Sequence, residues 1–147
     1  MTSHSETRLL PYTADLMFAI VSDVEKYPEF LPWCVALRVL SKERVKERDV
    51  LRAEMLVGFG ALRERYTSRV VLDAVARTID VVQTDGPFRH LESRWSFAPE
   101  GEGCRVDFSI AFEFKNRLLE TIAGNAFERA LLKMTDAFDA RARALSH

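Results

Sequence analysis

The most constraining feature of this sequence is a change of hydrophobic period close to Asn116. Between Val35 and Phe114 the apolar residues recur at every second position in short runs, which is the period of a strand. From Asn116 almost to the C-terminus they recur at the helical period of 3.6. Some 28 helical residues at ~1.5 Å each span about 40 Å. The sequence therefore predicts a C-terminal helix long enough to cross a whole curved sheet.

Six runs of alternating residues precede this helix. They cover residues 35–45, 50–60, 62–72, 78–86, 91–99 and 104–114. Turn-forming segments rich in Gly, Pro and charged residues separate the runs, which predicts an antiparallel meander. The last run is the clearest, because its apolar residues alternate strictly with polar or small ones. One face of the predicted sheet is therefore apolar and strongly aromatic.

The residues before the meander predict a strand and two short helices. Residues 4–10 form the strand, and Thr13 is suited to cap a helix whose apolar residues keep helical spacing. That helix stops at Pro28, which itself can open only a short helical turn. The expected fold is α+β, in the order strand, two short helices, six strands and one long helix.

Composition favours a single domain over residues 1–147. The 147 residues are enough to bury a core that needs no disulfide cross-links, and two cysteines are too few for a disulfide framework. Twenty-one basic and 22 acidic residues give a net charge of −1, so the chain has no overall positive charge that would attract DNA or RNA. No leader or membrane span is recognisable in the sequence. We expect a bacterial cytoplasmic protein that makes at most peripheral contact with the inner membrane.

The segment KYPEFLPWC, residues 26–34, concentrates aromatic surface at a bend. Pro28 and Pro32 exclude both a long helix and a strand there. Tyr27 and Phe30 fall on one side of a single turn, and Trp33 follows it. The segment either plugs the corner between helix and strand or forms one lip of a cavity.

The order of elements is similar to the helix-grip fold of START-type domains, and this segment resembles the coenzyme-Q-binding subfamily. Bacterial members of that subfamily are also described as RatA-type ribosome-association toxins and grouped with polyketide cyclases. The matching motif residues are Tyr27, Pro28, Phe30, Pro32, Trp33 and Cys34. The resemblance implies a curved antiparallel sheet of about seven strands wrapped around the long helix, with a deep apolar cavity for a lipid between them.

Periodicity predicts the rest of the cavity lining. If the aromatic sheet face is concave, the lining consists of Met55, Val57, Phe59, Tyr66, Trp95, Phe97, Phe112, Phe114, Leu119, Ile122, Phe127 and Met134. Tyr66, Trp95 and Gln83 are the candidates for holding a quinone head. Residues 58–60 and the pair Pro87–Phe88 are candidates for further lips. The alternative for each of these residues is ordinary core packing.

Catalytic patterns are not apparent in the sequence. It contains no nucleophile elbow, phosphate loop or zinc-ligand spacing, and His4, His90 and His147 stand alone. Glu64 shares the parity of the apolar face, where it is either a buried acid or the exposed end of its strand. Cys34 has no histidine placed to activate it. We therefore expect a protein that is not an enzyme and requires no cofactor.

Arg63, Arg65 and Arg69 share the opposite parity and form a basic row on the outer face of the predicted sheet. Such a row is usually a solvated face paired with acids. The alternative is contact with anionic lipid or with ribosomal RNA phosphates.

Three functions remain open. The first is a non-catalytic carrier that binds ubiquinone or a similar isoprenoid lipid and supports its delivery to the respiratory chain. The second is a RatA-type protein that binds the large ribosomal subunit and blocks subunit association. The third is a polyketide aromatase or cyclase, which ranks last because few polar groups are predicted to face inward.

Overall fold

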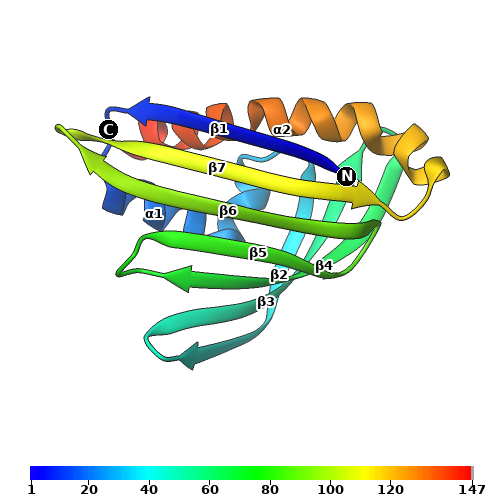
Figure 1. Cartoon of the computed structure of the whole chain (residues 1–147), viewed down its shortest axis with the longest axis horizontal. Helices are drawn as coiled ribbons and strands as arrows, with labels where there is room; N and C mark the ends of the chain where they lie inside the picture. Colours follow the sequence, from blue (N-terminus) through cyan, green and yellow to red (C-terminus); the bar gives the residue numbers. More distant parts are fainter. Residues whose placement is uncertain (147) are drawn as a thin grey trace.

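The computed structural model describes residues 1–146 and contains seven strands, two α-helices and one short 3-10 helix (Figure 1). In chain order the elements are β1 (Thr2–Leu10), α1 (Ala14–Ser22), η1 (Val24–Glu29), β2 (Cys34–Val45), β3 (Arg48–Phe59), β4 (Leu62–Asp73), β5 (Thr78–Asp85), β6 (Phe88–Glu100), β7 (Gly103–Phe114) and α2 (Arg117–Leu145). This confirms the predicted order of a strand, two short helices, six strands and a long helix.

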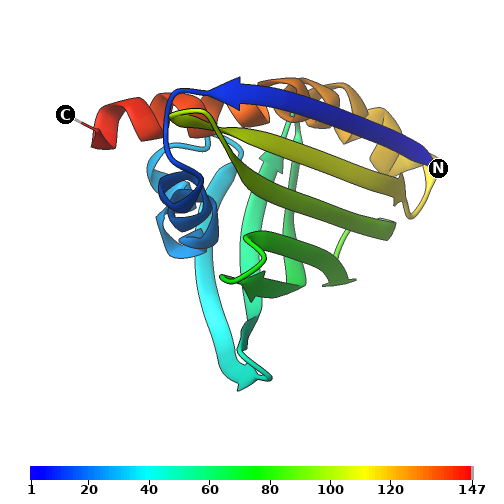
Figure 2. The same cartoon turned by 60° about the vertical axis from the view of Figure 1, so that its left-hand side comes forward.

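All seven strands belong to one antiparallel sheet in the order β1-β7-β6-β5-β4-β3-β2. The sheet curves strongly, so that β2 and β3 run across the direction of β1 and β7 (Figure 2). The long helix α2 lies along the concave side, beside β1 in both views, and α1 closes one end (Figures 1 and 2). This is the helix-grip arrangement.

Side-chain caps define where both α-helices begin. The Thr13 hydroxyl accepts a hydrogen bond of 3.1 Å from the Leu16 N–H at the start of α1. The Asn116 carboxamide oxygen accepts one of 2.9 Å from the Leu119 N–H at the start of α2. Each cap satisfies a backbone donor that has no partner within the helix.

The strand boundaries differ from the prediction mainly at the turn between β5 and β6. The Gly-Pro pair suggested a loop up to His90, yet β6 begins at Phe88. The Gln83 side chain closes this turn, since its amide donates to the Phe88 carbonyl at 2.7 Å and its oxygen accepts from the Phe88 N–H at 3.2 Å. A side chain of the preceding strand thus closes the turn next to the first residue of β6.

None of the helices in residues 1–146 combines the length and hydropathy needed to cross a membrane.

Candidate functional site

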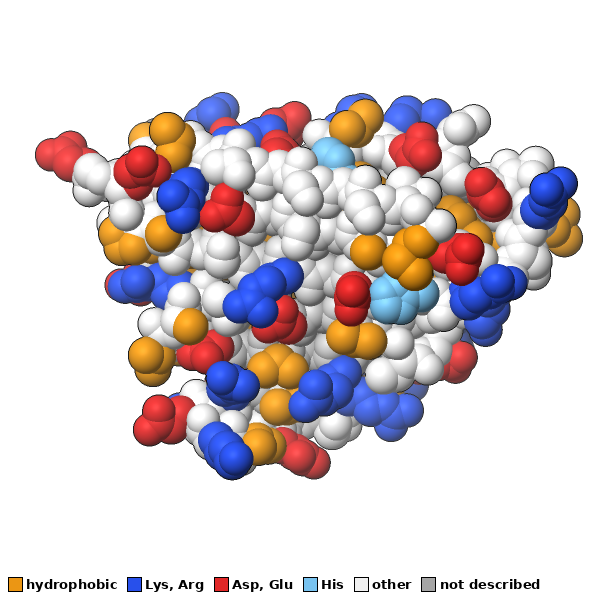
Figure 3. Space-filling view, viewed as in Figure 1, with side chains coloured by type: hydrophobic (Ala, Val, Ile, Leu, Met, Phe, Trp, Pro, Cys, Tyr) orange, Lys and Arg blue, Asp and Glu red, His pale blue; other side chains and the backbone are white. Residues whose placement is uncertain are grey.

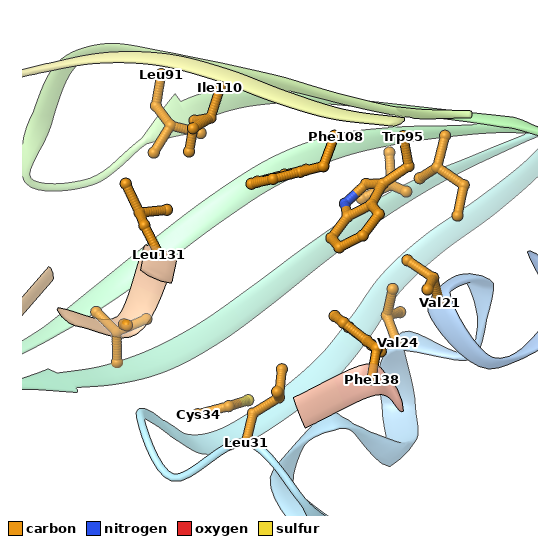
Figure 4. Packing of buried hydrophobic residues seen from close by; sticks show 14 of the residues in the cluster. Val21, Val24, Leu31, Cys34, Leu91, Trp95, Phe108, Ile110, Leu131 and Phe138 are labelled. Carbon is orange, nitrogen blue, oxygen red and sulfur yellow. The ribbon is translucent and has the colours of Figure 1, made fainter. Parts of the chain in front are cut away.

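A cavity of about 140 Å³ lies between the concave face of the sheet and α2. Its lining combines residues of the inner strand faces with residues of η1 and α2. Figure 4 shows Leu131 pointing from α2 toward Leu91 and Ile110 of the sheet, and Phe138 close to Trp95. The Trp95 ring centroid lies 5.2 Å from that of Phe138 and 4.3 Å from that of Phe108.

Nine of the residues predicted for the site lie around this cavity. They are Tyr27, Trp33, Met55, Val57, Phe59, Tyr66, Trp95, Phe127 and Met134. Trp33 and Met134 are only half-buried, whereas Phe127 and Trp95 are buried. The placement agrees with the parity argument, and whether these residues bind a ligand stays a prediction.

Four other predicted residues do not line the cavity, because their rings pack against other aromatic side chains of the core. Phe112 and Phe114 pack on Phe127, with ring centroids 4.6 and 5.7 Å away, and fill the space under the first half of α2. Phe97 packs edge-on against Phe18 of α1, with ring centroids 6.2 Å apart. Phe30 lies outside the lining and packs against Phe138, with ring centroids 5.4 Å apart. For these positions the core-packing alternative is the correct one.

The remaining three predicted residues lie at the surface or the edge of the core. Pro32 is exposed, and Leu119 is half-buried at the start of α2. Ile122 is 39% exposed, because its side of α2 faces outward beside the β3–β4 turn. The part of α2 that lines the cavity is therefore narrower than predicted, because it includes Phe127 and Met134 but neither Leu119 nor Ile122.

The lips proposed from the sequence are only partly correct in position. The turn at 58–60 does approach Trp33, whose carbonyl accepts a hydrogen bond of 2.9 Å from the Gly58 N–H. Gly60 takes φ +61° there, which favours glycine. Phe88 is a buried part of the cavity wall and not a lip: it is 3% exposed, and its ring centroid lies 4.8 Å from that of Phe114.

The motif around Pro28 and Pro32 serves as both plug and wall. The Tyr27 hydroxyl donates to the Val21 carbonyl and so ties η1 to α1. Tyr27 also packs edge-on against Phe138, with ring centroids 5.4 Å apart. The guanidinium carbon of Arg141 lies 5.0 Å from the centroid of the Phe30 ring. Trp33, after the bend, lies on the cavity wall.

Polar groups on the lining are few. Ser68 and Ser93, together with the Tyr66 hydroxyl, lie on the inner face of the sheet. The sequence-based site omitted both serines, although each sits at an inward position between apolar residues two places away. Gln83 is wrong as a head-group ligand, because its amide is used by the Phe88 backbone and it is not part of the lining.

The groups considered for catalysis lie elsewhere. Glu64 is exposed, and the described part of the lining contains no carboxylate, imidazole, amine or guanidinium. Burial raises the pKa of the Cys34 thiol to about 11, which disfavours the reactive thiolate. His4 lies on β1 beside Glu6, His90 lies beside Glu92, and His147 falls outside the described residues.

The arginine row lies on the outer face, as predicted. Arg63, Arg65 and Arg69 are all exposed, and only Arg65 approaches a carboxylate, Glu54 at 3.8 Å, within residues 1–146. Arg69 lies directly opposite Arg52 on β3. Like charges opposite each other in a sheet are unfavourable. Over much of the face presented in Figure 3 the basic side chains are instead interspersed with acidic ones.

Fold and cavity together define the class: a helix-grip protein whose sheet and long helix enclose a hydrophobic cavity. The chain belongs to the family described as polyketide cyclase / dehydrase and lipid transport, whose model matches residues 10–139. This confirms the family resemblance seen in the sequence.

Three relatives illustrate the range of this family. The ribosome association toxin RatA of Pseudomonas aeruginosa is 38% identical over 147 residues, covering 99% of both chains. The coenzyme Q-binding protein COQ10 homolog B of Xenopus laevis is 36% identical over 144 residues, covering 95% of this chain and 57% of that protein. A solved 18 kDa protein from Caulobacter crescentus is 41% identical with a TM-score of 0.81, covering 99% of both chains.

Proposed function

We propose that this protein binds ubiquinone or a similar isoprenoid lipid in the cavity, without catalysing a reaction on it, and supports its delivery to the respiratory chain. The observation that carries the proposal is the cavity itself, which is almost entirely apolar and has no charged side chain on its described lining. Apolar area removed from water stabilises a complex by roughly 25 cal/mol per Å². The name of the Xenopus relative supports coenzyme Q as the ligand.

The size of the cavity limits how such a ligand is held. A dry apolar cavity of about 150 Å³ accommodates a single benzene ring, and the cavity here is about 140 Å³. A complete prenylated quinone is far larger, so only a ring or a short part of the tail fits without rearrangement. We expect the half-buried side chains Trp33 and Met134 to move when a longer ligand enters.

The first experiment is mass spectrometry of an organic-solvent extract of the purified protein. Stoichiometric quinone in the wild type, with less in Trp33→Ala, supports the proposal. Leu132→Ala is the matched control, because Leu132 is 64% exposed on the outer side of α2 and lies outside the lining. An empty extract from a protein that also fails to take up added short-chain ubiquinone would contradict the proposal.

A second candidate function is association with the ribosome, which the name of the Pseudomonas relative suggests. The observation that favours it is the outer arginine row, where Arg63 and Arg69 have no acidic partner among residues 1–146. An exposed arginine without a partner is suited to phosphate. Cosedimentation with large ribosomal subunits tests this: the triple change of Arg63, Arg65 and Arg69 to Glu should abolish it, whereas Arg143→Glu on α2 should not.

A further inference from the structure

Three hydroxyl groups interrupt the apolar inner face of the sheet at the cavity. Tyr66 and Ser68 are successive inward residues of β4, and both are buried, at 9% and 4% exposure. Ser93 is the corresponding inward residue on β6. Among residues 1–146, no oxygen-bearing side chain other than these three and Tyr27 is part of the lining.

The register places these hydroxyls on either side of β5. On β5, Val81 lies directly opposite Val70 of β4 and directly opposite Ser93 of β6. Ser68 precedes Val70 by two residues and so lies one inward position away along β4. Neighbouring strands are about 4.8 Å apart and residues rise about 3.3 Å along a strand, so the backbones of Ser68 and Ser93 are separated by about two strand spacings across the sheet and about two residues along it. A flat ring lying over Val81 would therefore have hydroxyl groups at two of its edges.

Neither of the other polar candidates is free to bind a ligand. The Tyr27 hydroxyl already donates to the Val21 carbonyl, and the Gln83 amide is held by Phe88. In residues 1–146, the only side-chain nitrogen or oxygen that is fully enclosed without a partner is His4 Nε2. The hydroxyls of Tyr66, Ser68 and Ser93 are thus either hydrogen-bonded or open to the cavity.

Tyr66 can act as a hydrogen-bond donor in this group. Burial raises the pKa of its phenol, and the Ser68 hydroxyl lies close enough to interact with it. The phenol therefore keeps its proton over the whole physiological range and can donate a hydrogen bond. The serine hydroxyls can each donate or accept, which suits either a carbonyl or a hydroxyl on a ligand.

We propose that Tyr66, Ser68 and Ser93 form a subsite for an oxygen-bearing ring, in which the phenol and the two hydroxyls bind carbonyl or hydroxyl groups of the ring. This inference rests on the proposed function, since it requires that the cavity binds a ligand. It adds that affinity for the ring depends on hydrogen bonds, whereas affinity for a hydrocarbon tail does not. The cavity volume of about 140 Å³ suits one such ring.

The test compares two ligands that differ in the ring. A short-chain ubiquinone carries ring oxygens, and farnesene is an isoprenoid hydrocarbon without them. Quinone binding is followed by quenching of tryptophan fluorescence, because both tryptophans of the chain, Trp33 and Trp95, lie on the cavity wall. Farnesene binding is followed by the rise in the thermal midpoint, which depends on free ligand and its dissociation constant.

We expect Tyr66→Phe and Ser68→Ala each to weaken quinone binding about 3- to 10-fold, the range for one hydrogen bond, without changing the farnesene effect. Val70→Ala, which alters the same wall without removing a hydroxyl, should weaken both ligands. Tyr66→Phe and Ser68→Ala each remove only one oxygen, and the thermal midpoint of the free protein checks that they fold.

Three outcomes overturn the inference, and they separate it from the proposed function. If the wild type binds both ligands and the hydroxyl variants bind quinone as well as the wild type, the subsite is wrong and the proposed function stands. The same holds if the variants weaken both ligands equally. If the wild type binds neither ligand, the proposed function and the subsite both fail.

Discussion

Phe127 is the residue on which the two halves of the core converge. Its ring centroid lies 4.6 Å from Phe112, 5.0 Å from Phe88 and 5.1 Å from Phe59, so α2 contacts β7, β6 and β3 through one side chain. Aromatic pairs at such distances add to the stabilisation that burial provides. Phe127 also forms part of the cavity wall, so packing and cavity shape are coupled at this position.

We expect Phe127→Ala to lower the free energy of unfolding by about 3–5 kcal/mol, because it removes a buried ring and leaves a cavity that the three surrounding strands cannot close. Urea unfolding measures this. Leu132→Ala, on the exposed side of the same helix, should change stability by less than about 0.5 kcal/mol. Equal effects of the two substitutions would show that Phe127 is not a core residue.

Cys34 gives a second prediction at the scale of the residue. It is 3% exposed, and burial raises the pKa of its thiol to about 11. At pH 8 the thiolate is therefore scarce, and we expect Cys34 to react with a thiol reagent such as DTNB far more slowly in the folded protein than in 6 M guanidinium chloride, roughly 100-fold or more given both burial and ionisation. Fast labelling of the folded protein would contradict this.

Among the elements, the helices could be predicted in more detail than the strand ends. Thr13 and Asn116 are local signals, because a cap lies within three residues of the N–H that it satisfies. The start of β6 at Phe88 could not be predicted, since the strand begins through pairing with Phe114, 26 residues away. Pairing energy from a distant strand outweighs the local preference of a Gly-Pro turn.

The cap of α1 can be tested directly. We expect Thr13→Ala to lower the free energy of unfolding by about 1 kcal/mol, because the Leu16 N–H loses its partner. Thr13→Asn provides a different side-chain acceptor and should retain most of the stability. Circular dichroism during thermal unfolding measures both variants. If alanine and asparagine are equivalent, the cap contributes nothing.

At the scale of the whole molecule, polar contacts join the edge strand β1 to α2. Glu6 accepts hydrogen bonds from Arg8 at 2.7 Å and from Thr135 at 3.0 Å, and Arg8 also pairs with Asp136. Closer to the C-terminal end of α2, Arg141 donates to Glu29 at 3.0 Å. The C-terminal half of the helix is thus attached both to the sheet edge and to the end of η1.

Carboxylates on the surface set the response to acid. The Thr7 hydroxyl is the main cause that lowers the pKa of Asp107, and the Ala76 N–H is the main cause that lowers the pKa of Asp73. A carboxyl whose pKa is lower in the folded state stabilises the fold above its unfolded pKa and loses that effect as the pH falls. We therefore expect stability to decrease below about pH 4.

Urea midpoints between pH 7 and pH 2.5 measure this dependence. Thr7→Val removes the hydrogen bond to Asp107 and should make the decrease smaller than in the wild type. An unchanged midpoint down to pH 3 would contradict the expected linkage.

The sequence by itself determined the order of elements, the long amphipathic helix, the inward parity of the strands and the family. These features depend on local periodicity and short motifs, which each segment carries independently of its neighbours. Only the tertiary structure decided which inward residues border the cavity. Phe97, Phe112 and Trp95 are all buried inward residues of their strands, but of the three only Trp95 borders the cavity, because Phe97 packs on α1 and Phe112 packs on α2. A cavity is the volume that packing leaves unfilled, and it depends on all the surrounding side chains at once.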